Sequence, residues 1–371
     1  MSSKLLSPFT IRNLGLSNRI MRSATWDGTA DETGAVTDRS VAIYRELGSG
    51  GIGLIVTGYA FVSHPLGQAN PNQYGIYSDV LIPGWKRLVK AVREGGDSRI
   101  AMQIVHAGIN SVFLVRKGYT LLAVSKLAEV NRPHREMTDD DIEGIINDFT
   151  AAAVRVREAG FDAVQLHGAH GYLMSQFASP LFNRRTDRWG GSPENRRRFH
   201  VEVVRRIRKA VGKDYPVLIK FGVQDDREGG MSLAEGLETC RQMVDVGIDG
   251  IEVSSGVGTS SAVIKEGGSD RPAFRERAAA VKKTVNIPVA VVHGIRSLKM
   301  AEEIIDSGDV DMVSMSRPFI REPHLVSRWQ RGDIRPATCI SCNKCFPILM
   351  RGEPLECGEE RRLREEANVD N

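Results

Sequence analysis

The chain has 371 residues, of which 41% are hydrophobic and 26% are charged, a composition typical of globular enzymes with a large core. Its 50 basic and 46 acidic residues are spread along the chain and leave a formal net charge of +4, which argues against a dedicated nucleic-acid surface. No apolar run reaches the roughly eighteen residues of a membrane span, and the N-terminus lacks the apolar core of a signal peptide. We therefore expect a cytoplasmic protein that binds neither nucleic acid nor membranes.

Strand-like and helix-like segments alternate along most of the chain. A short lead-in at 5–16 is expected to form a hairpin that plugs one end of a barrel. The expected strands are 19–23, 52–57, 99–105, 163–167, 216–221, 250–254, 287–292 and 311–315. The expected helices are 38–47, 83–94, 138–159, 193–211, 232–246, 271–284, 298–306 and 323–330. This alternation predicts an α/β protein with a (β/α)8 TIM barrel over 1–335, or alternatively a doubly wound open sheet, followed by a cysteine-containing extension over 336–371 that packs on the barrel.

Active sites of such barrels lie at the C-terminal ends of the strands, so the residues at those ends form a testable set. They are mostly polar residues and glycines: Ser23, Ala24, Thr25, Trp26, Thr57, Gly58, Gln103, His106, His167, His170, Lys220, Ser254, Ser255, Gly256, His293, Gly294, Ser316 and Arg317. Gly294 and Arg317 follow the seventh and eighth strands, where barrels commonly bind phosphate. A turn glycine and a surface ion pair are the alternative interpretation of these two residues.

The segment from His167 to Tyr172 carries the densest chemistry. Two glycines flank His170, which allows the backbone to bend and bring both imidazoles and the phenol of Tyr172 to one pocket. Paired imidazole donors suit a carbonyl oxygen on which negative charge develops, and a phenol can deliver a proton. Taken singly, each of the three could equally be a buried core residue.

Several long motifs, including the one that contains these residues, resemble those of a known family. The run HGAHGYLMSQFASPLFNRRTDRWGGSPENRRRF resembles the signature of the old yellow enzyme (NADH:flavin oxidoreductase) family, which comprises FMN-dependent ene reductases. PFTIRNLGLSNRI, GGIGLIVTG, QIVHAG and SMSRPFIREP extend the resemblance over about residues 6–328. It implies a barrel with one FMN at the strand ends, which takes hydride from NADH or NADPH and passes it to the β-carbon of an enone, enal or enoyl thioester.

The resemblance also implies roles for individual residues. His167 and His170 would bind the substrate carbonyl oxygen, and Tyr172 would protonate the α-carbon. The expected FMN contacts are Gln103 at the pyrimidine edge, Lys220 near N1 and O2, Ser23, Ala24 and Gly58 against the ring, and Gly294, Ser316 and Arg317 at the phosphate. Thr25 and His167 complete the expected cofactor-binding set. The sequence departs from the family where relatives place a threonine or cysteine beside flavin O4: that position falls on Trp26, directly after Thr25. Ser316 replaces a common glycine.

Four of the five cysteines lie close together near the C-terminus. Cys339, Cys342, Cys345 and Cys357 read C-x2-C-x2-C-x11-C, a spacing that suits an iron–sulfur cluster, with zinc or vestigial thiols as alternatives. The run is similar to the 4Fe-4S loop of the branch that contains 2,4-dienoyl-CoA reductase and trimethylamine dehydrogenase. An FAD- and NAD-binding region follows the loop there, and we expect none here because the chain ends at Asn371. A cluster would allow an external electron-transfer protein to replace NAD(P)H as donor.

Three other functions compete with an ene reductase. A flavin and iron–sulfur amine dehydrogenase lacks the two-histidine pair, and a zinc-dependent barrel hydrolase would need carboxylates that the strand ends do not offer. An electron-transfer subunit would need the cluster but no substrate pocket. Neither the substrate nor the oligomeric state follows from the sequence, and a homo-oligomer is compatible with it. Cys240, in a helical stretch, is expected to be a small buried residue.

Overall fold

A computed structural model describes residues 3–258 and 273–369. Within them, eight parallel strands close into a barrel, because β4 pairs with β6 on one side and with β3 on the other. The barrel strands are β3 (Ile20–Arg22), β4 (Leu54–Val56), β6 (Arg99–Val105), β9 (Ala163–Gly168), β10 (Val217–Gly222), β11 (Gly250–Ser254), β12 (Val289–Val292) and β13 (Met312–Met315). The predicted (β/α)8 barrel is therefore confirmed, and the open sheet is excluded.

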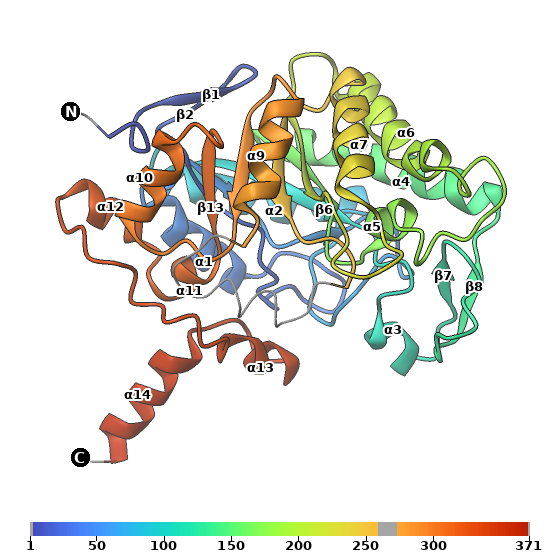
Figure 1. Ribbon diagram of the computed structural model, residues 1–371. Coiled ribbons are helices and arrows are strands. Elements are labelled where there is room, and N and C mark those ends of the chain that lie inside the picture. The colour runs from blue at the N-terminus through green and yellow to red at the C-terminus, as the bar shows by residue number, and fades with distance from the viewer. Residues whose placement is uncertain (1–2, 259–272, 370–371) are drawn as a thin grey trace.

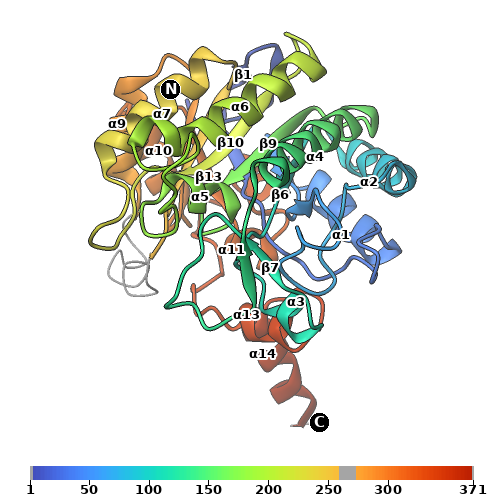
Figure 2. The same ribbon diagram turned by 90° about the vertical axis from the view of Figure 1, so that its right-hand side faces the viewer.

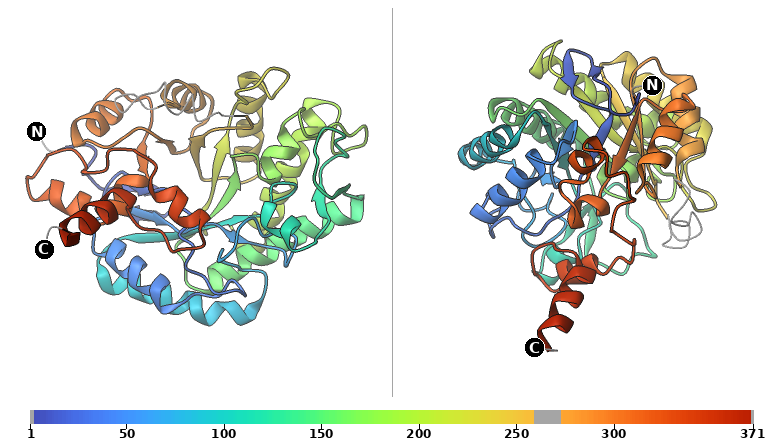
Figure 3. Two further views of the ribbon diagram at one scale, coloured as in Figure 1. Left: turned by 90° about the horizontal axis from the view of Figure 1, so that it is seen from below. Right: turned by 90° about the vertical axis from the view of Figure 1, so that its left-hand side faces the viewer.

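Helices surround the strands, as the view along the barrel shows (Figure 3). They are α1 (Asp38–Gly48), α2 (Ile82–Gly95), α4 (Asp139–Glu158), α6 (Pro193–Val211), α7 (Leu233–Asp245), α9 (Arg275–Thr284), α10 (Leu298–Asp306) and α12 (Leu325–Gln330). Each matches a predicted helix within a few residues, although the expected start of α9 at 271–272 lies outside the described residues. Side-chain capping boxes at Thr37, Thr138 and Ser232 explain why α1, α4 and α7 begin where they do.

Shorter elements that the sequence pattern did not predict lie in the connections. They are β5 (Ala60–Phe61), the 3-10 turn η1 (Asp79–Leu81), α3 (Val112–Arg116), β7 (Leu121–Ala123), β8 (His134–Glu136), α5 (Leu173–Ala178), α11 (Arg317–Arg321), α13 (Cys345–Met350) and α14 (Gly358–Val369). Most have three to six residues, too few for a clear hydrophobic period.

The lead-in forms the predicted hairpin, from β1 (Phe9–Ile11) and β2 (Leu14–Leu16), which pair antiparallel. Its side chains Ile11, Leu14 and Leu16 pack against apolar side chains at the N-terminal end of the barrel. These include Met21, Leu54, Ala101, Leu218 and Met312. The hairpin thus closes the N-terminal end of the barrel, and α13 and α14 lie at the opposite end (Figure 1). Figure 2 shows α3 and β7 on the same end as α13.

The barrel interior changes from apolar to polar towards the C-terminal strand ends. Above the plugged apolar layer lie six buried polar side chains: Ser23, Gln103, Gln165, Lys220, Glu252 and Ser314. They are linked by hydrogen bonds across the barrel, so the layer carries few unpaired groups despite its burial. Among all the residues that the structure describes, no helix is long and apolar enough to cross a membrane.

Candidate active site

The end of β9 brings His167, His170 and Tyr172 together. The ring centroids of His167 lie 5.0 Å from those of His170 and 4.9 Å from those of Tyr172. The sharp turn is made by His170 itself (φ 61°) and Gly171 (φ 75°), whereas Gly168 continues the strand. A left-handed conformation is uncommon outside glycine, so the histidine is held there by its surroundings.

Backbone contacts define the proton position on His167. Its Nδ1 lies 3.3 Å from the amide nitrogen of Ala169, which donates to it. The ring is buried, and burial lowers the pKa of His167 well below its usual value, with the charges of His170 and Lys220 acting in the same direction. A neutral ring whose Nδ1 accepts must carry its proton on Nε2, so His167 offers an Nε2–H donor.

His170 is anchored on a neighbouring strand. Its Nε2 lies 2.8 Å from Oγ of Ser254, and its backbone N–H donates to the carbonyl of Ser255. Although His170 is accessible from the pocket, desolvation by the surrounding protein atoms, followed by the charges of Lys220 and His293, lowers its pKa to about 3, so this ring is neutral too. When Nε2 accepts from the Ser254 hydroxyl, Nδ1–H is the donor that is left for a ligand.

Tyr172 is part of a phenol pair that sequence reasoning missed. Its hydroxyl donates to the hydroxyl of Tyr59 at 3.2 Å, and Nδ2 of Asn70 donates to the same Tyr59 oxygen at 2.7 Å. Burial raises the pKa of Tyr172, partly offset by these hydrogen bonds, and raises that of Tyr59 further. Both phenols therefore keep their protons at neutral pH. Tyr59 directly follows Thr57-Gly58, so reading one residue beyond that strand end would have found it.

The expected pyrimidine-edge residues lie in the polar layer. Nζ of Lys220 donates to Oγ of Ser23 at 2.6 Å and forms a 3.3 Å ion pair with Glu252. Nε2 of Gln103 donates to Oε1 of Gln165 at 2.7 Å. Sequence reasoning did not find Gln165 and Glu252 as site residues, because polar residues inside strands are usually taken for solvent-facing positions.

Several buried polar atoms at the strand ends are available to a ligand. Within the described residues, Oγ1 of Thr57, Nε1 of Trp26 and Nε2 of His106 are buried without a hydrogen-bond partner. They belong to the ends of the second, first and third barrel strands. Buried polar atoms rarely lack partners, so this set is consistent with a cofactor that supplies acceptors at the strand ends.

Three other expected flavin contacts are occupied differently. The amide of Gly58 donates to the Tyr44 hydroxyl at 2.7 Å, and Oγ1 of Thr25 lies 2.7 Å from Oγ of Ser316. Ala24 packs against the apolar layer near the hairpin. These residues can contact a flavin through van der Waals surface, but the Gly58 amide is not free to donate.

The expected phosphate residues line one small cleft. Gly294, Ser316 and Arg317 surround a space of about 40 Å³ at the ends of β12 and β13. Gly294 has φ 79°, a left-handed conformation that glycine adopts readily where the chain turns after β12. Arg317 also donates through Nη1 to the Asn343 side chain at 2.7 Å and to the Ser341 carbonyl, so it joins this cleft to the cysteine loop.

A larger cavity, of about 540 Å³, opens beyond His170. Its walls come from the loop after β6, the segment before β8, the turn after β9 and the loops after α5 and β11. They include Ile109, Arg132, Phe182 and Val257. Pockets for small organic ligands have about 300–1,000 Å³. The size and the mixed lining suit a substrate that reaches the histidine pair from this side.

The cysteine loop contains two non-glycine residues in the left-handed region, Ser341 (φ 57°) and Asn343 (φ 59°). Burial raises the pKa of Cys339, and the nearby thiols of Cys357 and Cys342 add to the rise. In the described ranges, no three His, Cys, Asp or Glu side chains are already arranged as a metal site. The four thiols are free, and they lie close enough together that Cys339 interacts electrostatically with Cys342 and Cys357, and Cys345 with Cys339 and Cys342. Cys240 is buried in α7, and burial raises its pKa.

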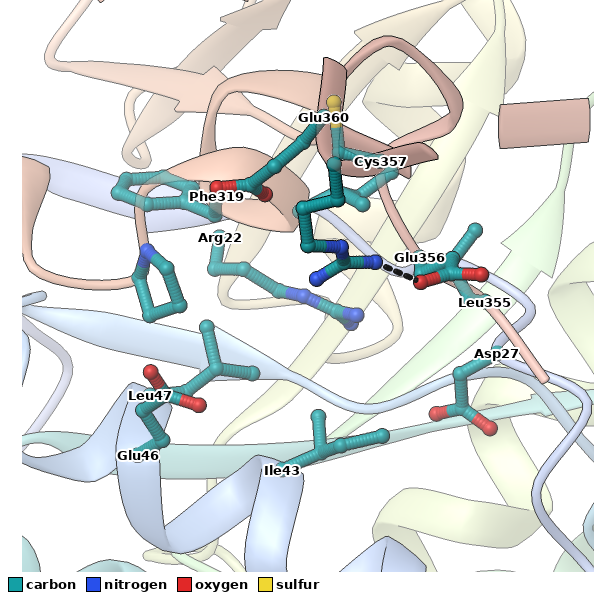
Figure 4. Close-up of a pocket in the computed structure, with 13 residues that line it drawn as sticks. Arg22, Asp27, Ile43, Glu46, Leu47, Phe319, Leu355, Glu356, Cys357 and Glu360 are labelled. Atoms are coloured by element: carbon teal, nitrogen blue, oxygen red, sulfur yellow. Dashed lines mark hydrogen bonds and ion pairs between the residues drawn. The ribbon is translucent and has the colours of Figure 1, made fainter. Parts of the chain in front are cut away.

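A separate cavity of about 170 Å³ lies where the extension meets the outside of the barrel (Figure 4). Arg22 and Asp27 point into it from the barrel, Ile43 and Leu47 from α1, and Cys357 from the extension. The amide of Leu355 donates to the Asp27 carbonyl at 2.8 Å, which ties the extension to the loop after β3. The histidine pair and Tyr172 do not line this cavity.

Comparison with known proteins assigns this barrel to a family. The chain belongs to the NADH:flavin oxidoreductase / NADH oxidase family, whose profile matches residues 4–334. It is 38% identical to an NADH oxidase of Thermoanaerobacter brockii, over 91% of this chain and 52% of that protein. It is 36% identical to an NADPH dehydrogenase of Clostridium acetobutylicum, over 87% of this chain and 93% of that protein.

Solved structures agree with this assignment. A 2-naphthoyl-CoA reductase in complex with 2-naphthoyl-CoA superimposes with a TM-score of 0.88 at 28% identity, covering 96% of this chain and 57% of the other. The chain therefore spans about half the length of this reductase and of the NADH oxidase, but almost the full length of the NADPH dehydrogenase. The family resemblance read from the sequence motifs is confirmed.

Proposed function

We propose that the protein is an FMN-dependent oxidoreductase that reduces the C=C bond of α,β-unsaturated carbonyl compounds with electrons from NADH or NADPH. The observation that carries the proposal is the convergence of His167, His170 and Tyr172 at the end of β9. Two neutral imidazole donors and one phenol are the groups that a conjugated carbonyl needs, and they favour a carbonyl over an amine substrate.

Each residue has a defined task in this proposal. Nε2–H of His167 and Nδ1–H of His170 bind the carbonyl oxygen and stabilise the negative charge that develops on it. Tyr172 holds a proton that it can give to the α-carbon, and Tyr59 and Asn70 keep its hydroxyl in place. The cavity beyond His170 receives the rest of the substrate. Enoyl thioesters are included in the substrate class because the structural relative named above binds an aryl-CoA thioester.

The residues present fit FMN. Gln103 and Lys220 would hold its pyrimidine edge, Ser23, Ala24, Thr25 and Gly58 its ring, and Gly294, Ser316 and Arg317 its phosphate. When bound, FMN supplies hydride transfer between the nicotinamide and the alkene. Trp26, whose buried N–H has no acceptor among the described residues, is available to a flavin oxygen.

We further infer that Cys339, Cys342, Cys345 and Cys357 bind a 4Fe-4S cluster. Two short loops with left-handed Ser341 and Asn343 carry the first three thiols. Burial raises the pKa of Cys339, and the nearby thiols of Cys357 and Cys342 raise it further. Closing a cluster would require the thiols to move together from their present positions. The cluster would let a protein electron donor serve in place of NAD(P)H, and three exposed apolar side chains beside the loop, Ile340, Phe346 and Met350, offer such a donor a contact.

One experiment tests the central proposal. Protein purified without oxygen is analysed for FMN, iron and sulfide, and its flavin is reduced with NADH, NADPH or reduced viologen. Enones, enals and enoyl thioesters are then supplied as oxidants. We expect bound FMN that is reduced by a nicotinamide and reoxidised by at least one conjugated carbonyl compound. Flavin that is reoxidised by none of them, although oxygen reoxidises it, contradicts the proposed substrate class.

A further inference from the structure

A buried carboxylate lies at the centre of the polar layer beneath the candidate site. Glu252 on β11 is 2% exposed, and its two oxygens have different partners. Oε1 accepts from the hydroxyls of Ser23 at 2.7 Å and Ser314 at 2.8 Å and lies 3.3 Å from Nζ of Lys220. Oε2 accepts from Nε2 of Gln165 at 3.0 Å. Four other barrel strands therefore donate to one side chain.

The carboxylate is ionised. Burial favours the protonated acid, but Lys220 and the three other donors outweigh burial and lower the pKa of Glu252. An ionised carboxylate can only accept hydrogen bonds. Its charge therefore sets the direction of every hydrogen bond that leads away from it.

The side-chain amides of Gln165 and Gln103 continue this donor-to-acceptor order away from Glu252. Gln165 must turn its Nε2 to Glu252, which leaves its Oε1 to accept from Nε2 of Gln103 at 2.7 Å. Gln103 then keeps its Oε1, for which the described part of the chain provides no donor. The end of this chain is consequently an acceptor, presented by a buried side chain at the C-terminal end of β6.

We propose that Glu252 is a positioning residue which, through Gln165, holds Gln103 with its amide oxygen towards the cofactor, where it accepts the N3–H of the flavin. The inference rests on the proposed function, because it takes FMN as the ligand at Gln103. It assigns to a residue three strands away in the barrel, on β11, the choice of which amide atom of Gln103 the ligand meets.

Replacing the carboxylate with an amide reverses the chain. In Glu252→Gln, Ser23, Ser314 and Lys220 still converge on the Oε1 position, so the amide oxygen has to stay there. The NH2 group then faces Gln165, which must answer with its oxygen and turn its own NH2 to Gln103. Gln103 loses its free acceptor and presents N–H to the flavin N–H, a pairing of two donors.

A second substitution restores the direction. In Glu252→Gln/Gln165→Glu, the carboxylate moves to position 165 and accepts from both neighbouring amides. Gln103 again has to donate through Nε2 and keep its oxygen free. The net charge of the barrel interior is the same as in the wild type, so a general effect of charge cannot explain the rescue.

The test compares FMN with 3-methyl-FMN, which lacks the N3–H. Apo-protein is titrated with each flavin, and dissociation constants are taken from the quenching of flavin fluorescence. We expect Glu252→Gln to weaken FMN about tenfold, the scale of one buried hydrogen bond, and to leave 3-methyl-FMN within about twofold. The double variant should bind FMN as the wild type does. Glu238→Gln, which removes a surface carboxylate of α7, is the matched control and should change neither constant.

Equal weakening of both flavins by Glu252→Gln, or no rescue in the double variant, overturns the inference. If Glu252→Gln does not fold, Gln165→Leu cuts the link to Gln103 while Glu252 keeps its three other partners. It should also weaken FMN selectively, and equal weakening of both flavins by this variant again counts against the inference. Wild-type protein that folds but binds neither flavin refutes the proposed function itself, a result distinct from all of these.

Discussion

The site at the end of β9 and the cysteine extension are constructed differently. His167 is buried, Tyr172 is half-buried and His170 is exposed. Each has a polar atom that hydrogen-bonds to a nearby strand or loop. The cysteine loop turns through left-handed Ser341 and Asn343, and apolar side chains beside it are more than half exposed. Contacts within the protein define the geometry of the first region, whereas the second contains thiols near one another but no formed metal site among the described residues. Barrel strands can preorganise a site alone, and a terminal loop needs its ligand to complete it.

The largest effect is expected in the extension. A cluster needs all four thiolates, so Cys339→Ser, Cys342→Ser, Cys345→Ser and Cys357→Ser should each lose iron and sulfide together. FMN should stay bound, because its expected contacts lie on strand ends. Cys240→Ser, buried in α7, is the control and should keep iron, sulfide and FMN. The measurement is iron, sulfide, zinc and flavin per chain after anaerobic purification.

Wild-type protein with stoichiometric FMN but neither iron nor sulfide would contradict the cluster. The extension would then have no cofactor of its own, and the barrel would contain the complete active site. Stoichiometric zinc with no iron would instead support the zinc alternative.

The next effect concerns the histidine pair. His167→Ala and His170→Ala each remove one preorganised donor, which should slow alkene reduction by about 10²–10³-fold. FMN content should not change, since in the proposed function the free ring nitrogens bind the substrate carbonyl oxygen. Rapid mixing of reduced enzyme with an enone measures the rate, and titration with a phenol measures ligand binding from the flavin spectrum. Phenol-induced spectra identical to wild type in both variants would remove these residues from the substrate site.

The sequence predicted the strand ends because strand order follows from chain order in a barrel. His167, Lys220 and Gln103 could be placed at one end of the barrel without knowing any distance, since each lies within the last three residues of a buried strand. Their partners could not be predicted. Glu252 belongs to no recognisable sequence motif. Its hydrogen bonds with Ser23, Gln165 and Ser314 join residues that are far apart in the chain.

The turn at His170 shows a second limit. Its two flanking glycines suggested that they would provide the bend, but the histidine and only one of them adopt the left-handed conformation. Likewise, Gly58 was expected at the flavin, and its amide is bound by Tyr44 from α1. Local sequence indicates where the backbone can bend, while tertiary contacts decide which residue bends and which donor is used.

A smaller effect is expected for the phenol pair. Tyr172→Phe removes the proton but keeps the ring beside His167, so reoxidation of reduced flavin by an enone should slow by about 10²-fold. Reduction by NAD(P)H should stay near the wild-type rate. Stopped-flow measurement of the two half-reactions separates these outcomes, and Tyr59→Phe, which removes only the acceptor of Tyr172, should slow reoxidation less. Equal slowing of both half-reactions by Tyr172→Phe would argue against a role as proton donor.

The smallest effect is thermodynamic and concerns a histidine far from the chemistry. His200 on α6 is buried against Phe221, and neither ring nitrogen has a partner among the described residues. Burial lowers the pKa of His200 to about 3, so on acidification the unfolded chain takes up this proton near pH 6.5 and the folded chain does not. The free energy of unfolding therefore falls as the pH drops below about 6.5, by up to about 1.4 kcal/mol per pH unit for one histidine. His200→Leu should remove that part of the slope between pH 6.5 and 5, measured by denaturant unfolding of the apo-protein, while His324→Leu at a half-exposed position should keep it. A slope in His200→Leu as steep as in the wild type would mean that His200 is protonated in the folded protein, and the buried core would then have to hold a charge beside Phe221.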